Sequence, residues 1–165
     1  MLVHVPEAAP IVGEWRLRHT YDAPLGIPPH VTLLFPFVPA EELTSEAEER
    51  LARLLGEVEP FDVAFRRAAR FPDVLYLEPE PSERFAELTG AIAAEWPEHP
   101  PYEGAHEVVI PHLTVAEGDD DELLTRIRSD VEPKLPLRTH VREAQLYAED
   151  DAGRWHEHSR LPLGR

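Results

Sequence analysis

The chain has 165 residues, enough for one compact domain with a hydrophobic core. Its 16 basic and 32 acidic residues give a formal net charge of -16, which disfavours a long nucleic acid as partner. The absence of cysteine excludes disulfides, thiolate metal sites and a thiol nucleophile. No stretch approaches the roughly 18 apolar residues of a membrane span, and the first residues have no signal-peptide pattern. We therefore expect a cytoplasmic protein that has no membrane partner.

The first half of the chain predicts two strands, a helix and two further strands. The runs over 11–19 and 30–38 have the composition of strands. Leucines and an alanine then recur at helical spacing over 43–55, which predicts an amphipathic helix. Strand-like runs follow over 61–71 and 73–78.

The next part of the chain predicts two helices on either side of a strand. Apolar residues at helical spacing follow Ser82 and predict a helix that ends at Trp96. The run over 108–116 reads as a strand. The acidic residues 119–122 are typical of a helix start, where carboxylates meet the positive end of the helix dipole, and the helix continues to Val131.

The last part of the chain predicts a closing pair of strands. Strand-like runs over 137–149 and 154–161 flank Asp150, Asp151, Ala152 and Gly153, a composition that favours a hairpin turn. Strands and helices are thus mixed along the chain without regular alternation. The predicted fold class is α+β.

One five-residue pattern occurs twice, 82 residues apart. Residues 29–33 read PHVTL and residues 111–115 read PHLTV. In a strand, residues i and i+2 point to the same face, so each motif presents an imidazole beside a hydroxyl. The residues that point the other way are expected in the core: Val31, Leu33, Phe35, Leu113 and Val115.

Two imidazoles and two hydroxyls that converge on one volume suit phosphoryl chemistry. A histidine with a pKa near its usual value of about 6.5 can act as acid or base at neutral pH, and displacement at phosphorus needs one group on each side. Threonine hydroxyls can donate hydrogen bonds to the non-bridging phosphate oxygens. We therefore predict His30 and His112 as catalytic residues and Thr32 and Thr114 as substrate-binding residues, with no metal or cofactor.

These motifs resemble those of the 2H phosphoesterases, the family that includes 2'-5' RNA ligases and cyclic nucleotide phosphodiesterases. Residues 26–37 look like the first motif of a bacterial branch, and residues 74–77 with the 82–96 helix resemble its middle. The resemblance implies two pseudo-symmetric lobes around a central cleft, each an antiparallel sheet flanked by helix, with the motifs on central strands. It also implies that both histidines are catalytic, with His112 as base and His30 as acid.

Residues 1–165 are accordingly expected to form a single two-lobed domain. The expected substrate is a small nucleotide or cyclic phosphate, or a short RNA end, and a monomer is expected. Three groups of residues could add charge or base stacking at the cleft, although solvated strand edges and cross-strand packing explain them equally well. They are Arg16 with Arg18, Arg66 with Arg70, and Tyr76 with Tyr147.

Two alternative functions remain open from the sequence. A nucleotide or phosphate sensor could keep both motifs without turnover. A metal-dependent hydrolase could use His156 and His158, which flank Glu157, but two ligands do not make a zinc site and no third has an obvious spacing.

Overall fold

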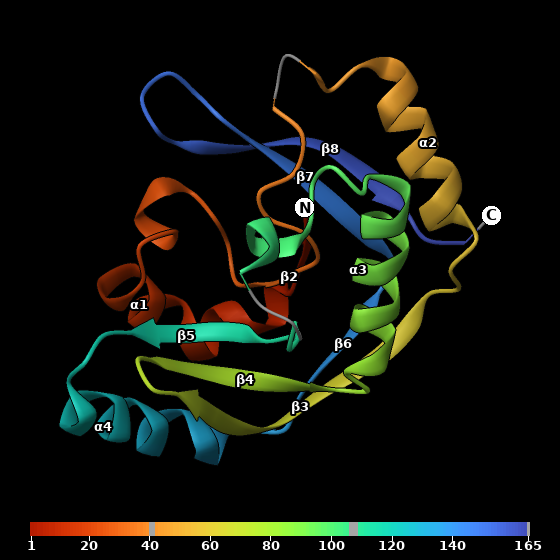
Figure 1. Ribbon diagram of the computed structural model, residues 1–165. Coiled ribbons are helices and arrows are strands. Elements are labelled where there is room, and N and C mark those ends of the chain that lie inside the picture. The colour runs from red at the N-terminus through yellow and green to blue at the C-terminus, as the bar shows by residue number, and fades with distance from the viewer. Residues whose placement is uncertain (40–41, 106–108, 165) are drawn as a thin grey trace.

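Two four-stranded antiparallel sheets make up the framework of the protein (Figure 1). The computed structural model describes residues 1–39, 42–105 and 109–164. One sheet has the order β2-β1-β7-β8, from β2 (His30–Thr32), β1 (Leu2–His4), β7 (Glu143–Glu149) and β8 (Trp155–Pro162). The other has the order β5-β4-β3-β6, from β5 (Leu113–Glu117), β4 (Val74–Glu80), β3 (Phe61–Phe71) and β6 (Leu137–Val141).

The predicted α+β fold with two antiparallel lobes is confirmed. The two motif strands, β2 and β5, each lie at an edge of their sheet, whereas the family resemblance implied central positions. The two edges contact each other, so the sheets meet where the motifs are (Figure 1). Counted from this junction, the strand order is β2-β1-β7-β8 in one lobe and β5-β4-β3-β6 in the other.

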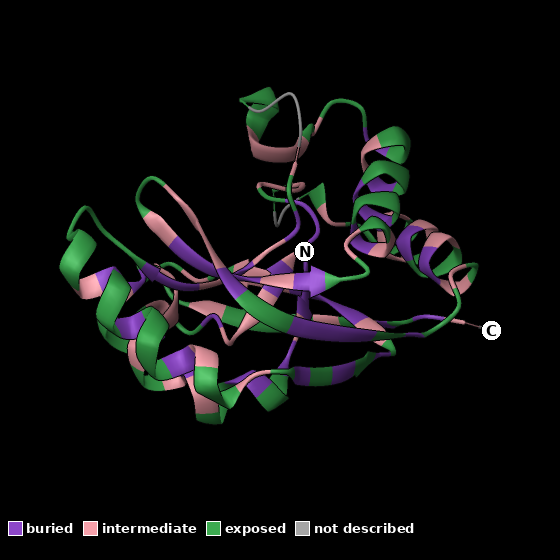
Figure 2. Cartoon of the chain, turned by 90° about the horizontal axis from the view of Figure 1, so that it is seen from below, coloured by how far each residue is buried: buried purple, intermediate pink, exposed green. Residues whose placement is uncertain are grey.

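Four α-helices cover the sheets. They are α1 (Ala9–His19), α2 (Ser45–Gly56), α3 (Glu83–Glu95) and α4 (Asp121–Val131). The last three were predicted, and two of them begin with a side-chain cap, since Thr44 and Asp120 accept backbone N–H groups of their own helices. Buried and exposed residues alternate around the helices of Figure 2, as expected for helices that cover a core. Among the described residues, no helix is long and apolar enough to cross a membrane.

Helix α1 is the main error of the sequence-based prediction, which had a strand over 11–19. The stretch WRLRH alternates apolar and charged residues like a strand. In the structure Val12 and Arg16, four residues apart, occupy the buried face of the helix, whereas 60% of Leu17 is exposed. Hydrophobic periodicity fails here because a charged residue holds a buried position.

Three strand predictions also need correction. The short strand β1 was missed, and the strand predicted over 30–38 ends at Thr32 because Leu33 and Leu34 are both buried, which breaks the alternation. The predicted strand 137–149 divides into β6 and β7, which belong to different sheets. The predicted strand 108–116 begins in the structure at Leu113, and residue 108 lies outside the described residues. The predicted hairpin between β7 and β8 is confirmed.

Arg16 joins segments that are far apart in sequence. Only 1% of its side chain is exposed. One terminal nitrogen donates to the Thr114 carbonyl at 2.6 Å, and the other donates to both Asp22 oxygens at 2.8 and 2.9 Å. The Thr20 hydroxyl also donates to Asp22, at 2.7 Å. The guanidinium thus holds the loop after α1 against β5.

This contact predicts a large difference between two arginines of the same helix. Arg16→Met should lower the free energy of unfolding by about 3 kcal/mol, because it leaves Asp22 and a buried carbonyl without their partner. Arg18→Met should change it by at most about 0.5 kcal/mol, because the Arg18 ion pair with Glu14 is exposed. Urea denaturation measures both values. Equal midpoints for the two variants would contradict the assigned role of Arg16.

Candidate active site

The first motif places His30 and Thr32 side by side on β2. Both residues are half-buried, whereas Val31 between them is completely buried, as the strand alternation predicts. The His30 Nε2 atom lies 3.1 Å from the Thr32 hydroxyl oxygen. The polar face of the motif therefore presents an imidazole and a hydroxyl in direct contact.

The second motif lies at the start of β5 and has the same alternation of buried and partly exposed residues. His112 immediately precedes the strand, Thr114 lies on it, and Leu113 and Val115 are completely buried. The His112 ring also makes edge contacts with Phe71 and Tyr76, at centroid distances of 5.3 and 5.5 Å. These contacts fix the orientation of the imidazole.

Both histidines are oriented by the same backbone hydrogen bond. The Nδ1 atom of His30 lies 2.8 Å from the Pro28 carbonyl oxygen, and Nδ1 of His112 lies 2.7 Å from the Ile110 carbonyl oxygen. Because a carbonyl only accepts, Nδ1 carries the proton in each ring. In a neutral imidazole this leaves a lone pair on Nε2, which in His30 accepts a hydrogen bond from the Thr32 hydroxyl.

The loop after α1 lies between the two motifs. The Asp22 carboxylate is 3.9 Å from His30 Nδ1 and is held by Arg16, which also binds the Thr114 carbonyl. In the same loop, the backbone N–H of Tyr21 donates to Glu117 at the end of β5. A short run of contacts therefore links the first motif to the second.

Burial and charge lower the pKa of His30. Desolvation is the largest cause of the lowered pKa, and the nearby Arg16 guanidinium is the second. Asp22 and the Pro28 carbonyl raise the pKa. The resulting pKa is about 4. Burial also lowers the pKa of His112, against opposing effects of its bond to Ile110 and of Glu117. The imidazole of His30 is therefore neutral at pH 7.

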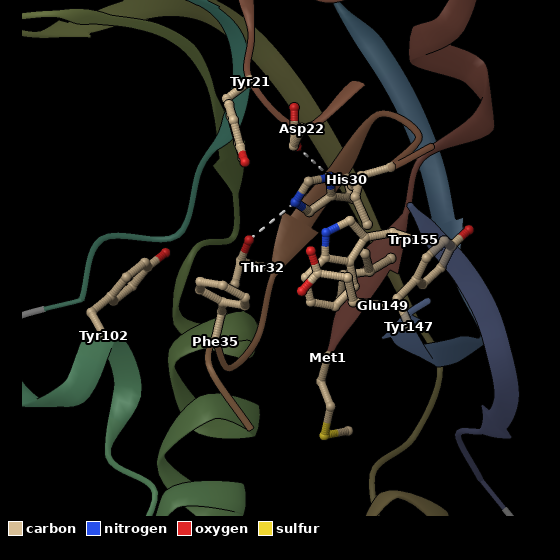
Figure 3. Close-up of a pocket in the computed structure, with 12 residues that line it drawn as sticks. Met1, Tyr21, Asp22, His30, Thr32, Phe35, Tyr102, Tyr147, Glu149 and Trp155 are labelled. Atoms are coloured by element: carbon tan, nitrogen blue, oxygen red, sulfur yellow. Dashed lines mark hydrogen bonds and ion pairs between the residues drawn. The ribbon is translucent and has the colours of Figure 1, made fainter. Parts of the chain in front are cut away.

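A pocket of about 430 Å³ opens beside the first motif (Figure 3). Its lining contains His30, Thr32 and Asp22, and most of the rest is apolar or aromatic. His112 and Thr114 are not among the described residues that line it. Neither arginine nor lysine is present in the lining, which consists of Met1, Leu2, Tyr21, Asp22, Ile27, His30, Thr32, Phe35, Tyr102, Tyr147, Glu149 and Trp155.

Several of these pocket residues were not found from the sequence. Phe35, expected in the core, is 49% exposed and packs edge-on against Trp155 with ring centroids 6.0 Å apart. Tyr102 has a left-handed backbone with φ of 51°, and its N–H donates to the Phe35 carbonyl at 2.7 Å. Burial raises the pKa of Tyr102, and its hydrogen bond with Thr32 opposes this. A non-glycine residue at positive φ beside a motif threonine is typical of a functional site.

Of the other predicted substrate contacts, Tyr147 lines the pocket and the rest do not. Tyr147 lines the pocket, whereas Tyr76 is buried and stacks on Phe71 with centroids 4.4 Å apart. The four arginines lie outside the pocket lining. Each forms an ion pair with a carboxylate: Arg16 with Asp22, Arg18 with Glu14, Arg66 with Glu80 and Arg70 with Asp121.

The possible metal ligands on β8 pair with carboxylates of different elements. His156 lies 2.9 Å from Asp150, and His158 lies 3.1 Å from Glu48 on α2. In the part of the chain that the structure describes, no group of three or more suitable side chains could hold a metal ion. The donor set there does not fit a catalytic metal site.

Comparison with known proteins identifies relatives along nearly the whole chain. Residues 4–153 match the family described as the 2'-5' RNA ligase superfamily. A protein of Oceanobacillus iheyensis named "Putative phosphoesterase" is 27% identical over 90% of this chain and 88% of its own length. A protein of the same name from Bacillus pumilus is 31% identical over 78% of this chain and 71% of its own length.

Solved structures share the fold. TT0787 of Thermus thermophilus has a TM-score of 0.66 at 22% identity, covering 99% of this chain and 97% of its own. E. coli LigT complexed with 3'-AMP has a TM-score of 0.60 at 19% identity, covering 99% and 96%. The fold agrees with the family match over residues 4–153, and the chain belongs to the 2'-5' RNA ligase superfamily of phosphoesterases.

Proposed function

We propose that the protein cleaves a 2',3'-cyclic or 2'-5' phosphodiester of a nucleotide or short RNA end, without a metal, using His30 and His112 as base and acid. The observation that carries this proposal is the matched orientation of the two rings. In each, a backbone carbonyl two residues earlier holds Nδ1 and leaves Nε2 for proton transfer. The contact between the motif edges β2 and β5 supports a common site for both rings.

The pKa of His30 favours this residue as the base. At about 4, it leaves the ring neutral throughout the physiological range. Nε2 of His30 removes a proton from water, the water oxygen bonds to phosphorus, and the bond from phosphorus to the ribose oxygen breaks. His112 enters this step as the imidazolium, protonated on both ring nitrogens; it gives its Nε2 proton to the departing oxygen and becomes neutral. This assignment is the reverse of the one that the family pattern implies.

The two motif threonines stabilise the negative charge that develops on the phosphate. Each hydroxyl lies on the same strand face as its histidine and can donate to a non-bridging oxygen as negative charge develops. The Thr32 hydroxyl, which contacts His30 and Tyr102, has to turn its proton from His30 Nε2 to the phosphate in order to act as this donor. The two hydroxyls thus donate hydrogen bonds to the phosphate without the need for a positively charged side chain.

The charge of the pocket lining favours a singly charged diester. The described residues of the lining include Asp22 and Glu149 but neither arginine nor lysine, so a dianionic monoester would be repelled. LigT structures containing 3'-AMP, NADP+ and ATP indicate that a protein of this fold accepts small nucleotides. A small cyclic nucleotide is both a singly charged diester and a small nucleotide, and it is therefore the substrate that we propose.

Substitution of the four motif residues tests the catalytic proposal. His30→Gln and His112→Gln should each lower kcat/KM for 2',3'-cyclic nucleotides by about 10²- to 10⁴-fold, the usual effect of losing a positioned acid or base. Thr32→Val and Thr114→Val should cost about 10- to 10²-fold, because each removes one donor while proton transfer remains possible. Steady-state hydrolysis assays measure these changes.

Folding controls accompany these assays. Val31→Asp and Leu113→Asp place a carboxylate in the core and should prevent stable folding, which circular dichroism would detect. Undiminished turnover in either histidine variant would refute the catalytic proposal. A protein that binds cyclic nucleotides without turnover would be a sensor, and loss of hydrolysis in excess chelator would favour the metal-dependent alternative.

The low pKa of His30 predicts how stability depends on pH. In the unfolded chain His30 takes up a proton near pH 6.5, but in the folded protein only near pH 4. Between these values the unfolded state binds more protons, so the contribution of His30 to stability falls as the pH is lowered from 6.5 to 4. His30→Gln should reduce this slope, as measured by urea denaturation across the window. An NMR titration showing His30 protonated at pH 6 would contradict the prediction.

A further inference from the structure

The pocket extends from His30 to the turn between β7 and β8, and aromatic rings form much of its wall. Phe35 follows the first motif and Trp155 begins β8, and the two rings make an edge-to-face contact. Tyr147 on β7 also lines this end (Figure 3). Flat aromatic walls suit a nucleobase, which stacks on such side chains. The volume of about 430 Å³ is sufficient for a small ligand of this kind.

One acidic side chain interrupts this aromatic wall. Glu149 is the last residue of β7 and lines the pocket (Figure 3). Within the described part of the chain, its carboxylate makes no hydrogen bond or ion pair. The adjacent Asp150 is fully engaged in the turn, where it accepts from Ala152, Arg154 and His156. Of the acidic residues at this turn, Glu149 is the one that lines the pocket, and its side chain is exposed to solvent.

The chemistry of a carboxylate restricts which base it can favour. An ionised carboxylate only accepts hydrogen bonds, and two parallel N–H donors satisfy it best. Guanine presents two such donors on one edge, N1–H and the 2-amino group. Adenine presents one amino group beside an unprotonated ring nitrogen, whose lone pair would face the carboxylate. Hypoxanthine retains N1–H but lacks the 2-amino group.

We infer that this pocket is a guanine-selective subsite, in which Glu149 accepts hydrogen bonds from N1–H and the 2-amino group while the phosphodiester lies at His30 and Thr32. This inference rests on the proposed function and specifies its substrate as a guanosine 2',3'-cyclic phosphate or a guanosine-ended 2'-5' linkage. The aromatic walls bind the base, and Glu149 selects among bases.

Three cyclic nucleotides that differ only in the base test the selectivity. The wild-type kcat/KM for the 2',3'-cyclic phosphates should be highest for guanosine and about tenfold lower for inosine, which loses one charge-assisted hydrogen bond. It should be lower again for adenosine, whose ring-nitrogen lone pair faces the carboxylate. Glu149→Gln should lower the value for guanosine about 10- to 10²-fold and reverse the order of guanosine and adenosine, since an amide pairs with the adenine edge.

A matched substitution on the same strand provides the control. Glu143 also lies on β7 but outside the pocket lining, where it binds Gln145 and Arg160. Glu143→Gln makes the same chemical change and should leave the order guanosine, inosine, adenosine intact. A loss of selectivity in this variant as well would show that the effect of Glu149→Gln does not arise in the pocket.

The inference can fail independently of the proposed function. Equal hydrolysis of all three substrates, in reactions that depend on His30 and His112, would overturn guanine selectivity and leave the phosphodiesterase standing. If no substrate is hydrolysed, NMR titration with guanosine, inosine and adenosine still tests the subsite, because these nucleosides carry no phosphate. Preferential guanosine binding that Glu149→Gln abolishes would support it, and equal binding of the three nucleosides would overturn it.

Discussion

The relative position of the two motifs depends on one buried guanidinium. Arg16 binds the Thr114 carbonyl of the second motif and the Asp22 carboxylate, which lies 3.9 Å from His30 of the first. A charge with only 1% of its side chain exposed is costly to bury unless it is fully paired. A shift of β5 relative to the loop after α1 would take the Thr114 carbonyl away from one terminal nitrogen, in a guanidinium whose buried Nε already has no partner. The same guanidinium helps to keep His30 neutral.

Most of the fold follows from periodicity because most buried positions are apolar. Helices α2, α3 and α4 bury leucine, isoleucine and phenylalanine at helical spacing, and β3 coincides with its predicted range of 61–71. Prediction failed where burial is decided by tertiary contacts. A charged residue occupies the inner face of α1, and Arg142 separates two strands that look continuous in sequence but join different sheets.

The four motif residues of the candidate site could be predicted from the sequence, and the pocket beside the first motif could not. His30, Thr32, His112 and Thr114 are marked by a repeated local pattern, and strand geometry alone predicts that each pair shares a face. The pocket instead combines side chains from distant segments, such as Phe35 and Trp155, which meet only in the folded chain. No spacing rule connects such residues, because their proximity depends on how the sheet β2-β1-β7-β8 is assembled.

The two lobes are alike in how they hold the motif histidines and different in what surrounds the two rings. Each motif histidine is held by a carbonyl two residues earlier, so the two rings have equivalent tautomers. Around His112 the neighbouring rings, Phe71 and Tyr76, stack on one another and fill the space. Around His30 the corresponding space is an open pocket. In the proposed mechanism, a repeated architecture would supply two proton-transfer groups while only one lobe would recognise the base, and this difference would give an asymmetric substrate a single orientation.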